Sequence, residues 1–307
     1  MSEVTLALGG GGVKGIAHIG VIRRLEEEGY QIKAVAGTSA GGIVGALLAA
    51  GYDSHRLESV LNEFTTANFF SRANNEGPSL MGLNGLSNAL IKTLGSKTFE
   101  ELVLPFACTA VDLNTAQEMI LNQGRVVDSV IATVAFPGVF PPKELQGHEL
   151  VDGGVLDPVP VALARWLAPQ YPVIAVCLSP KPENWGKIPP FQVPPNTPIP
   201  KPLLTQISKL RLAQAFNVFS RSIDISSRML AETRLQLDKP DAIIRPEVYM
   251  YGIIDNVNPQ HLIELGYKAA DEAMPSIAET LSIRNKITRR FVKHTLLGKE
   301  IDDQPES

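Results

Sequence analysis

One stretch decides the fold of this chain: Val4-Thr5-Leu6-Ala7-Leu8-Gly9-Gly10-Gly11-Gly12-Val13-Lys14-Gly15, an apolar run that leads into a loop of glycines. Further along, Ala34-Val35-Ala36 leads in the same way into Gly37-Thr38-Ser39-Ala40-Gly41. Gly-x-Ser-x-Gly between a strand and a helix is typical of a nucleophile elbow, a turn so sharp that only glycine fits two positions either side of the serine. The elbow would present the Ser39 hydroxyl at the end of a sheet. The glycine loop would aim backbone N–H groups at an oxygen that becomes negative during acyl transfer.

Strands and helices are predicted to alternate along the chain. Val4–Leu8 and Ala34–Ala36 are expected to be strands, and Ile16–Glu28 and Gly41–Ala50 the helices that follow them. This order is typical of a parallel sheet covered on both faces. The sequence therefore predicts an α/β fold, a three-layer α/β/α sandwich with a mostly parallel central sheet. Later strands are expected at Phe106–Val111, Glu118–Leu121, Glu149–Asp152, Val173–Leu178 and Ala242–Arg245, and later helices at Asp53–Phe64, Leu83–Leu94, Arg125–Ala135, Pro158–Leu167, Leu203–Leu237 and Pro259–Leu281. Thr98–Glu101 resembles a capping box, and Asp157 and Asn258 are expected to cap the helices that begin at the prolines after them.

Composition divides the chain into four segments. Residues 1–180 hold the motifs and are expected to form the catalytic core. Residues 181–202 are rich in proline, which excludes regular helix and central strand, so a loop is expected there, either a connector or a flap over the site. Residues 203–282 are expected to complete the same domain. Residues 283–307 are expected to form a basic C-terminal helix and tail, packed on the domain or lying on an anionic bilayer.

Composition also narrows the class of protein. With 307 residues, 44% of them hydrophobic and a net charge of −4, the chain is of ordinary globular type and its bulk charge indicates no nucleic-acid partner. Cys108 and Cys177 lie in apolar runs and have neither metal-ligand nor disulfide spacing, so both are expected in the core. No apolar run has the ~18–20 residues of a membrane helix, and no secretory signal is recognisable. We therefore expect a cytoplasmic protein without a metal or an organic cofactor.

A serine nucleophile needs a base, and Asp152 is the best candidate. It ends an apolar strand and precedes Gly153-Gly154, which would leave the carboxylate uncovered at the edge where parallel sheets place their sites. A carboxylate near ~3 Å from the hydroxyl can take its proton directly. Taken alone, Asp-Gly is also an ordinary turn. Of the five histidines, His261 comes closest to the place of an α/β-hydrolase histidine, but no acid on a clear strand end precedes it.

The combination of motifs resembles a known family. Gly10–Gly15 corresponds to a Gly-Gly-Gly-x-Arg/Lys-Gly loop, Gly37–Gly41 to the elbow, and Asp152–Gly154 to an Asp-Gly-Gly/Ala motif. A block with proline, Ala132–Pro141, stands between the last two, with Thr133 where serine is common. In this order and spacing the sequence, over Val4–Leu178, resembles the patatin-like phospholipases, acyl hydrolases with a serine–aspartate dyad.

The resemblance implies that Ser39 attacks an ester carbonyl while Asp152 accepts its proton. It implies a phospholipid or another fatty-acyl ester as substrate, and transient contact with a membrane surface. Lys14 would neutralise charge near the site or hold a lipid phosphate, unless it is a solvated lysine at a helix start. The implied oxyanion hole consists of Gly10, Gly11, Gly12 and Val13. The implied supporting residues are Lys14, Gly15, Gly37, Gly41, Gly153, Gly154 and Pro137.

Other functions remain to be separated from this one. The glycine loop also fits a Gly-x-Gly-x-x-Gly dinucleotide fingerprint, but such a site needs an acidic residue after the second strand, where this chain has Gly37-Thr38-Ser39. A non-catalytic lipid-binding or regulatory protein could use the same fold, and an acyltransferase could use the same residues. The sequence leaves the head group, the acyl chain length and the oligomeric state open.

Overall fold

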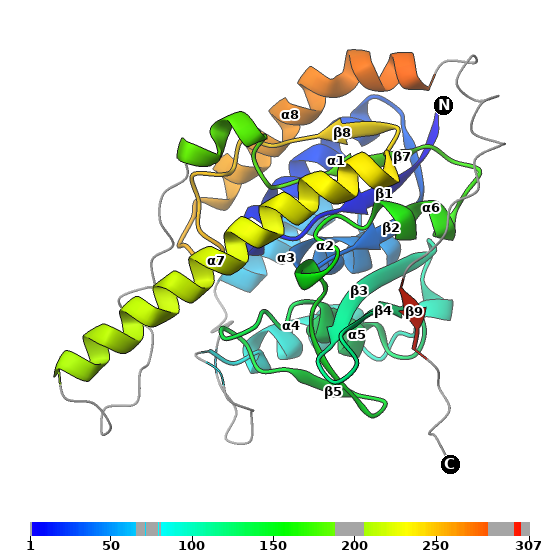
Figure 1. Ribbon diagram of the computed structural model, residues 1–307. Helices are drawn as coiled ribbons and strands as arrows, with labels where there is room; N and C mark the ends of the chain where they lie inside the picture. The colour runs from blue at the N-terminus through cyan, green and yellow to red at the C-terminus, as the bar shows by residue number, and fades with distance from the viewer. Residues whose placement is uncertain are drawn as a thin grey trace.

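The centre of the molecule is a single sheet (Figure 1), seen in a computed structural model that describes residues 2–65, 71, 79, 81–187, 206–281 and 298–301. Among these residues nine strands form the sheet in the order β5-β6-β3-β2-β1-β7-β8, with β4 beside β3 and β9 beside β4. Five of the strand pairs are parallel and three are antiparallel, so the predicted mostly parallel sheet is confirmed. The strands are β1 (Glu3–Leu8), β2 (Gln31–Gly37), β3 (Phe106–Asp112), β4 (Gln117–Leu121), β5 (Lys143–Leu145), β6 (His148–Asp152), β7 (Val173–Val176), β8 (Ala242–Ile244) and β9 (Lys299–Glu300).

Helices cover both faces of the sheet, which makes the three predicted layers. One face packs against α1, α2, α3, α4, α5 and α8, and the other against α6 and the C-terminal part of α7. These helices are α1 (Ala17–Glu27), α2 (Ala40–Ala49), α3 (Ser54–Thr65), α4 (Asn84–Leu94), α5 (Val126–Thr133), α6 (Val161–Leu167), α7 (Gln206–Asp238) and α8 (Pro259–Thr280). Short 3-10 turns are η1 (Gly12–Ile16), η2 (Phe99–Glu101), η3 (Gly153–Val155) and η4 (Pro182–Lys187).

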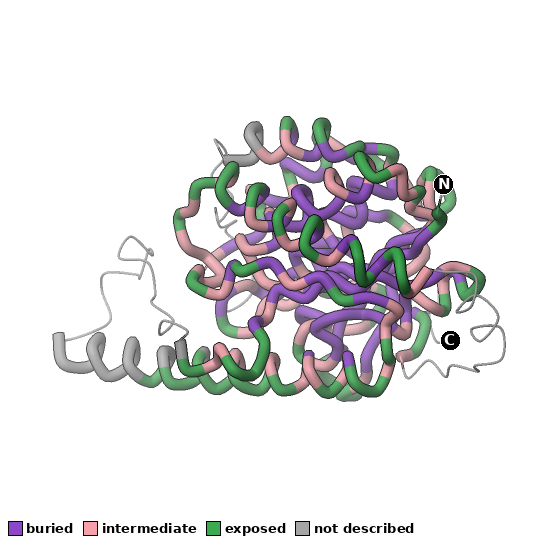
Figure 2. The backbone as a smooth tube through the Cα atoms, turned by 90° about the horizontal axis from the view of Figure 1, so that it is seen from above, coloured by how far each residue is buried: buried purple, intermediate pink, exposed green. Residues whose placement is uncertain are grey.

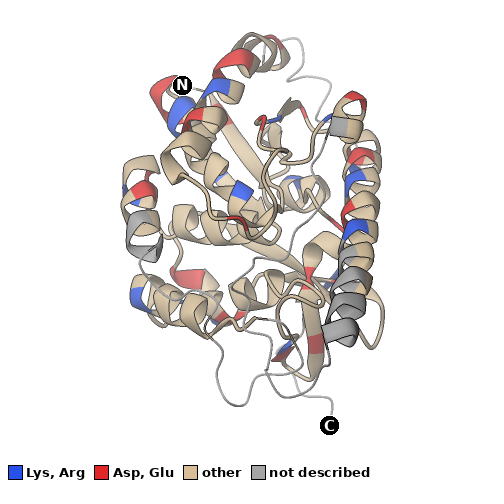
Figure 3. Cartoon of the chain, turned by 90° about the vertical axis from the view of Figure 1, so that its left-hand side faces the viewer, with Lys and Arg blue, Asp and Glu red and all other residues tan. Residues whose placement is uncertain are grey.

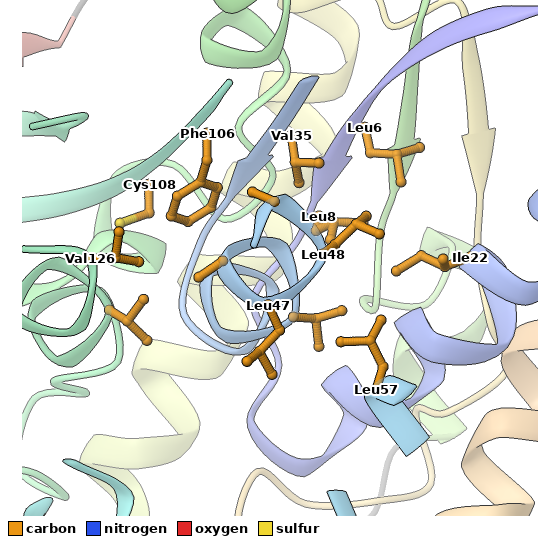
Figure 4. Close-up of a cluster of buried hydrophobic side chains, with 14 of the residues drawn as sticks. Leu6, Leu8, Ile22, Val35, Leu47, Leu48, Leu57, Phe106, Cys108 and Val126 are labelled. Carbon is orange, nitrogen blue, oxygen red and sulfur yellow. The ribbon is translucent and has the colours of Figure 1, made fainter. Parts of the chain in front are cut away.

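The two faces of the sheet differ in side-chain size. Strand residues alternate between faces, so Leu6 and Leu8 of β1 enter the larger core while Ala7 enters the smaller one. The larger core gathers leucine, isoleucine and phenylalanine around α2 (Figure 4), and full burial of each such side chain contributes ~1.5–3 kcal/mol. The strands present mostly alanine to the smaller core, which lets α6 lie close to the sheet. Figure 2 shows the buried positions concentrated in the strands, whereas the described part of α7 is mostly exposed or half-buried.

Predicted caps were right at two positions and wrong at a third. Thr98 and Glu101 form the expected capping box, and Asn258 caps α8 by accepting from the Gln260 N–H at 3.0 Å. The helix expected from Pro158, however, begins at Val161. The reason is a second proline at 160, which keeps the residue before it out of the helical region. Asp157 therefore does not cap α6, and its side chain is buried.

Two predicted segments fall largely outside the described residues. They are the proline-rich loop at 181–202, of which η4 is described, and the basic helix and tail at 283–307, of which residues 298–301 are described. In the second, Lys299–Glu300 forms β9 and pairs with β4, which the sequence did not indicate. Within the described part of the chain, no helix combines the length and hydropathy of a membrane span.

Candidate active site

The carboxyl ends of β2 and β6 lie next to each other along one edge of β3. β2 runs parallel to the first half of β3, with Gly37 opposite Cys108, and β6 runs antiparallel to the second half, with Asp152 opposite Ala110. Because β4 occupies the other edge of β3 at the same residues, β2 and β6 share one edge. Asp152 thus reaches the expected edge of the sheet, but from an antiparallel strand and not from a parallel one. The segments after both strands leave the sheet at one point.

Ser39 lies in the sharp turn between β2 and α2. Its backbone has φ 54° and ψ −122°, a conformation that non-glycine residues adopt only at a cost of ~1–3 kcal/mol. A Cβ on Gly37 would lie 2.4 Å from the carbonyl oxygen of Gly41, and one on Gly41 would lie 2.0 Å from that of Leu8. The Ser39 N–H donates to the Thr133 hydroxyl at 2.9 Å. The turn is therefore held by close backbone contact and by one side chain from α5.

Asp152 is buried beside Ser39, with 2% of its surface exposed. One carboxylate oxygen accepts from the Gly154 N–H at 2.8 Å, and the Ser39 side chain is near enough to act on the pKa of the carboxylate. Burial is the main cause that raises the pKa of Asp152 to about 6, while Ser39 and the Gly154 N–H act in the opposite direction. The group is thus a stronger base than an ordinary aspartate and is still ionised at neutral pH, as a general base requires.

Two threonines hold the elbow and the segment after Asp152 together. The Thr38 hydroxyl donates to the Asp157 carbonyl at 2.9 Å and lies 2.9 Å from the Thr109 hydroxyl, which must then be the donor to Thr38. A Cβ on Gly153 would lie 2.1 Å from the same Thr109 hydroxyl. Both threonines are fully buried. Sequence reasoning missed them, because threonine in a strand is ordinary and Thr38 occupies a variable place in the elbow motif.

The glycine loop offers two of the four predicted oxyanion donors. The Gly10 N–H donates to the Pro158 carbonyl at 3.0 Å, and the Val13 N–H donates to the Ile253 carbonyl at 3.0 Å. Those two donors are occupied, which corrects the expectation for them. Within the described residues, the N–H groups of Gly11 and Gly12 have no hydrogen-bond acceptor. The candidate oxyanion hole therefore narrows to Gly11 and Gly12.

The same loop packs against the elbow. A Cβ on Gly10 would lie 3.2 Å from the Ser39 Cβ, and one on Gly15 would lie 2.4 Å from the Ala40 Cβ. Behind the loop lies the buried His18, which is neutral because burial lowers its pKa to about 4. Its Nε2 lies 2.8 Å from the Gly9 carbonyl oxygen, and because a carbonyl can only accept, Nε2 carries the proton and donates it. Small residues on one side and His18 on the other thus fix the loop next to Ser39.

Pro137 lies in the turn that follows α5. Just before it, the Ala135 carbonyl accepts from the Asp152 N–H at 3.0 Å. The predicted proline block therefore contributes twice to the site, through this carbonyl and through the Thr133 hydroxyl that holds Ser39.

Lys14 projects from η1 beside the glycine loop. It is half-buried and has no carboxylate within ion-pair distance among the described residues. The pKa of Lys14 is lowered to about 8, mainly by burial and then by the charge of Arg228, while Cys177 and Asp255 act in the opposite direction. A lysine without a fixed anionic partner next to two free N–H groups makes this end of the site receptive to negative charge.

The remaining candidates lie elsewhere. His261 is on α8, half-exposed, beside Glu264 at 3.9 Å and the edge of Tyr251, and it makes no hydrogen bond to Ser39. Cys108 and Cys177 are free and buried, as expected. Among the described residues, no group of three or more histidine, cysteine, aspartate or glutamate side chains is arranged to hold a metal ion.

The residues of this site lie within a match to a known protein family. The family model described as patatin-like phospholipase matches residues 6–165, a little more than half of the chain, from β1 to α6. The chain belongs to the patatin-like phospholipase family. The match includes the glycine loop, the elbow and the Asp-Gly-Gly motif.

Its patatin-like relatives are longer proteins. An NTE family protein of Mycobacterium tuberculosis, itself uncharacterized, is 37% identical over 165 residues, which are 52% of this chain and 45% of the relative. Lysophospholipase NTE1 of Pyricularia oryzae is 27% identical over 304 residues, which are 91% of this chain and 19% of that enzyme. The chain thus spans less than half the length of these relatives. Among solved structures, VipD from Legionella pneumophila is 13% identical with a TM-score of 0.47, over 90% of this chain and 67% of VipD.

Proposed function

We propose that the protein hydrolyses fatty-acyl esters of lipids, as a phospholipase A or a lysophospholipase, through a dyad of Ser39 and Asp152. The observation that carries the proposal is that the Ser39 elbow and the buried Asp152 carboxylate lie together where the segments after β2 and β6 leave the sheet. Membership of the patatin-like family and the lysophospholipase named among its relatives support the reaction class.

In the first half-reaction, the Ser39 Oγ attacks the ester carbonyl carbon and Asp152 takes the Ser39 proton. The carbonyl oxygen becomes an oxyanion, which the N–H groups of Gly11 and Gly12 stabilise. When the tetrahedral intermediate collapses, the bond to the alcohol oxygen breaks and the protonated Asp152 gives its proton to the leaving alcohol. The acyl group remains on Ser39 as an ester.

In the second half-reaction, Asp152 takes a proton from water, and the hydroxide attacks the acyl-Ser39 carbonyl. The new tetrahedral intermediate collapses with return of the proton to the Ser39 oxygen, and the fatty acid leaves. The oxyanion donors act in both halves, and loss of one such donor typically costs ~10²–10³ in rate. One carboxylate therefore serves as base and acid in turn, with no histidine between it and the serine.

We also propose that residues 1–180 and 203–282 act as one catalytic domain. β8 extends the sheet that carries the site, and the Ile253 carbonyl holds the glycine loop through Val13. The C-terminal segments therefore support the site directly.

The decisive experiment measures hydrolysis of a short and a long p-nitrophenyl acyl ester by the wild-type protein, Ser39→Ala and Asp152→Asn. Each substitution is expected to lower kcat/KM by about 10³-fold or more, with an unchanged circular dichroism spectrum. Ser59→Ala, on the exposed side of α3, is the matched control and should keep full activity. Full activity in a folded Ser39→Ala protein would overturn the proposal.

Product analysis separates the two neighbouring functions. Release of free fatty acid in water identifies a hydrolase, whereas acyl transfer to an added alcohol in preference to water would identify a transferase. Binding of lipid without turnover in the wild-type protein would identify a non-catalytic lipid-binding protein.

A further inference from the structure

Three consecutive backbone carbonyls accept hydrogen bonds from three different parts of the molecule. They belong to Leu156, Asp157 and Pro158, which follow η3. The Asp157 carbonyl accepts from the Thr38 hydroxyl of the elbow at 2.9 Å. The Pro158 carbonyl accepts from the Gly10 N–H of the glycine loop at 3.0 Å, and the Leu156 carbonyl accepts from the Arg234 Nε of α7 at 3.2 Å. This short stretch of backbone therefore joins the elbow and the glycine loop to α7.

The η3 turn before these carbonyls supports Asp152. The N–H groups of Leu156 and Asp157 both donate to the Gly153 carbonyl, at 3.0 and 2.8 Å. Inside the same turn, the Gly154 N–H donates to the Asp152 carboxylate at 2.8 Å. Because these bonds close one compact turn, a displacement of its last residue would also displace the N–H group that stabilises the Asp152 carboxylate.

Arg234 is held in place at the end of this turn. Its Nη2 donates to the Glu118 carboxylate of β4 at 2.8 Å, while its Nε donates to the Leu156 carbonyl at 3.2 Å. Only 11% of the Arg234 side chain and 9% of the Glu118 side chain are exposed. The guanidinium is planar, so a bond at one nitrogen fixes the direction in which the other nitrogen points. β4 thus orients the group that α7 presents to the turn.

Other charged residues of α7 make a different kind of contact. Charges of both signs follow one another along this helix (Figure 3). Arg228 pairs with Asp224 one turn earlier on α7, and Glu232 pairs with Arg245 at 2.6 Å. These pairs join one side chain to another. Arg234 differs from them because one of its nitrogens bonds the backbone of the segment that follows the candidate general base.

Arg234 also lies outside residues 6–165, the segment that matches the family model. We propose that Arg234 is a positioning residue for the hydrolytic dyad, and that it acts by holding the Leu156 carbonyl. Through that carbonyl it fixes the turn beside Asp152 and, one residue further along the chain, the hydrogen bond to the elbow. Arg234 works through the backbone and not on the substrate, and the proposal rests on the proposed hydrolase function.

The first test measures hydrolysis of the short p-nitrophenyl acyl ester by Arg234→Lys. Lysine keeps a positive charge beside Glu118, but it has one nitrogen in place of the two that hold Glu118 and the Leu156 carbonyl. We expect kcat to fall at least about 10-fold and KM to change less than about twofold, because the substrate does not meet this side chain. Arg221→Lys, the same substitution at an exposed position of α7, is the matched control and should keep the wild-type kcat.

The pH–rate profile separates positioning from a loss of folded protein. The Gly154 N–H stabilises the ionised Asp152, so a loosened turn should raise the pKa of Asp152 above its value of about 6. The midpoint of the profile should therefore lie at higher pH in Arg234→Lys than in the wild-type protein. A smaller folded fraction would lower the rate without moving the midpoint, and an unchanged midpoint with full kcat would overturn the proposal.

Hydrogen exchange read by mass spectrometry tests the same positioning without turnover. A peptide that covers residues 153–158 should exchange faster in Arg234→Lys than in the wild-type protein and Arg221→Lys, whereas a peptide from α1 should be unchanged. Equal exchange of residues 153–158 in all three proteins would overturn the positioning role and leave the hydrolase function intact. An inactive wild-type protein would instead overturn the proposed function.

A second variant covers the case in which Arg234→Lys does not fold. Arg234→Gln combined with Glu118→Gln removes both buried charges at once, and it is compared with Glu118→Gln alone, which keeps an oxygen that accepts from Arg234. The double variant should show the lower kcat and the faster exchange of residues 153–158. Equal values in the two proteins would overturn the proposal.

Discussion

Asp152 determines how activity should depend on pH. The dyad needs this carboxylate ionised, and burial places its pKa at about 6. Below that pH the proton that Asp152 must accept is already in place, so kcat/KM for a neutral ester should fall about tenfold per pH unit below ~6 and level off above it. A pH–rate profile measured on a non-titrating ester checks this. A midpoint near the ordinary aspartate pKa would contradict the buried setting of the carboxylate.

Thr133 is expected to be a positioning residue for the nucleophile. Its hydroxyl is the acceptor for the Ser39 N–H, and its methyl group packs where a Cβ on Gly42 would lie 2.6 Å away. Thr133→Val keeps the shape and removes the acceptor, which leaves the partly buried Ser39 N–H unpaired at a cost of up to ~1–3 kcal/mol. We expect about a 10-fold or larger loss of kcat with little change in KM.

Thr133→Ser is the matched control, because it restores the hydroxyl and omits the methyl group. It should keep most of the wild-type kcat. If Thr133→Val were as active as Thr133→Ser in the same assay, the hydrogen bond would have no part in holding the elbow.

At the level of elements, the contact between α1 and α8 depends on two glycines. A Cβ on Gly20 would lie 1.9 Å from the Ile263 carbonyl oxygen, and one on Gly266 would lie 1.9 Å from that of Ala17. Gly266→Ala would normally favour a helix, but here it forces the helices apart and should lower the free energy of unfolding by ~1–3 kcal/mol. Urea denaturation measures the loss.

Lys268→Ala on the exposed side of the same helix is the control, and a change within about ±0.5 kcal/mol is expected. A stability for Gly266→Ala equal to that of the control would mean that α1 and α8 do not pack as closely as described.

Elements could be predicted from the sequence where local rules decide them. The strand–helix alternation, the capping box at Thr98 and the Asn258 cap follow from periodicity and from side chains that bind their own backbone. The start of α6 required the combined effect of two prolines, and β9 is too short to have a pattern of its own. The antiparallel direction of β6 is set by its pairing with β3, which no local signal records.

The candidate site shows the same division. Its motifs predicted that Ser39 and Asp152 would come together, because motif order reflects the fold. The two occupied donors, Gly10 and Val13, could not be predicted, since their acceptors are backbone carbonyls that any residue could supply.

At the scale of the whole molecule, a buried cluster joins β4, α7 and the segment after Asp152. Arg234 donates to Glu118 at 2.8 Å and to the Leu156 carbonyl at 3.2 Å, while Asp157 and Asp238 face the same cluster. Burial raises the pKa of both Glu118 and Asp157, and the charge of Glu118 raises the pKa of Asp157 further. At neutral pH the folded protein therefore keeps a proton on this cluster that the unfolded chain releases.

The sign of the resulting pH dependence follows from linkage. Where the folded state binds more protons than the unfolded state, the free energy of unfolding falls as the pH rises. This contribution is fully present below the ordinary aspartate pKa and is lost progressively as the pH rises through the raised pKa of the cluster. Asp157→Asn removes the titrating group at nearly constant shape, so its stability should vary less with pH than that of the wild-type protein.

Thermal unfolding of both proteins at about pH 6 and about pH 8 checks this prediction. Asp128→Asn, at a partly exposed ion pair on α5, is the control for a carboxylate outside the cluster. A parallel pH dependence in wild type and Asp157→Asn would mean that the cluster stays ionised in the folded protein.

The bond from the Val13 N–H to the Ile253 carbonyl has a consequence for biosynthesis. A ribosome makes Ser39 and Asp152 well before Ile253, so the growing chain contains both members of the dyad while the glycine loop still lacks this hydrogen bond. We expect such a nascent chain not to hydrolyse the membrane lipids around it. Hydrolysis would then begin only when translation has passed Ile253 and the last strand-to-helix connection has closed over the loop.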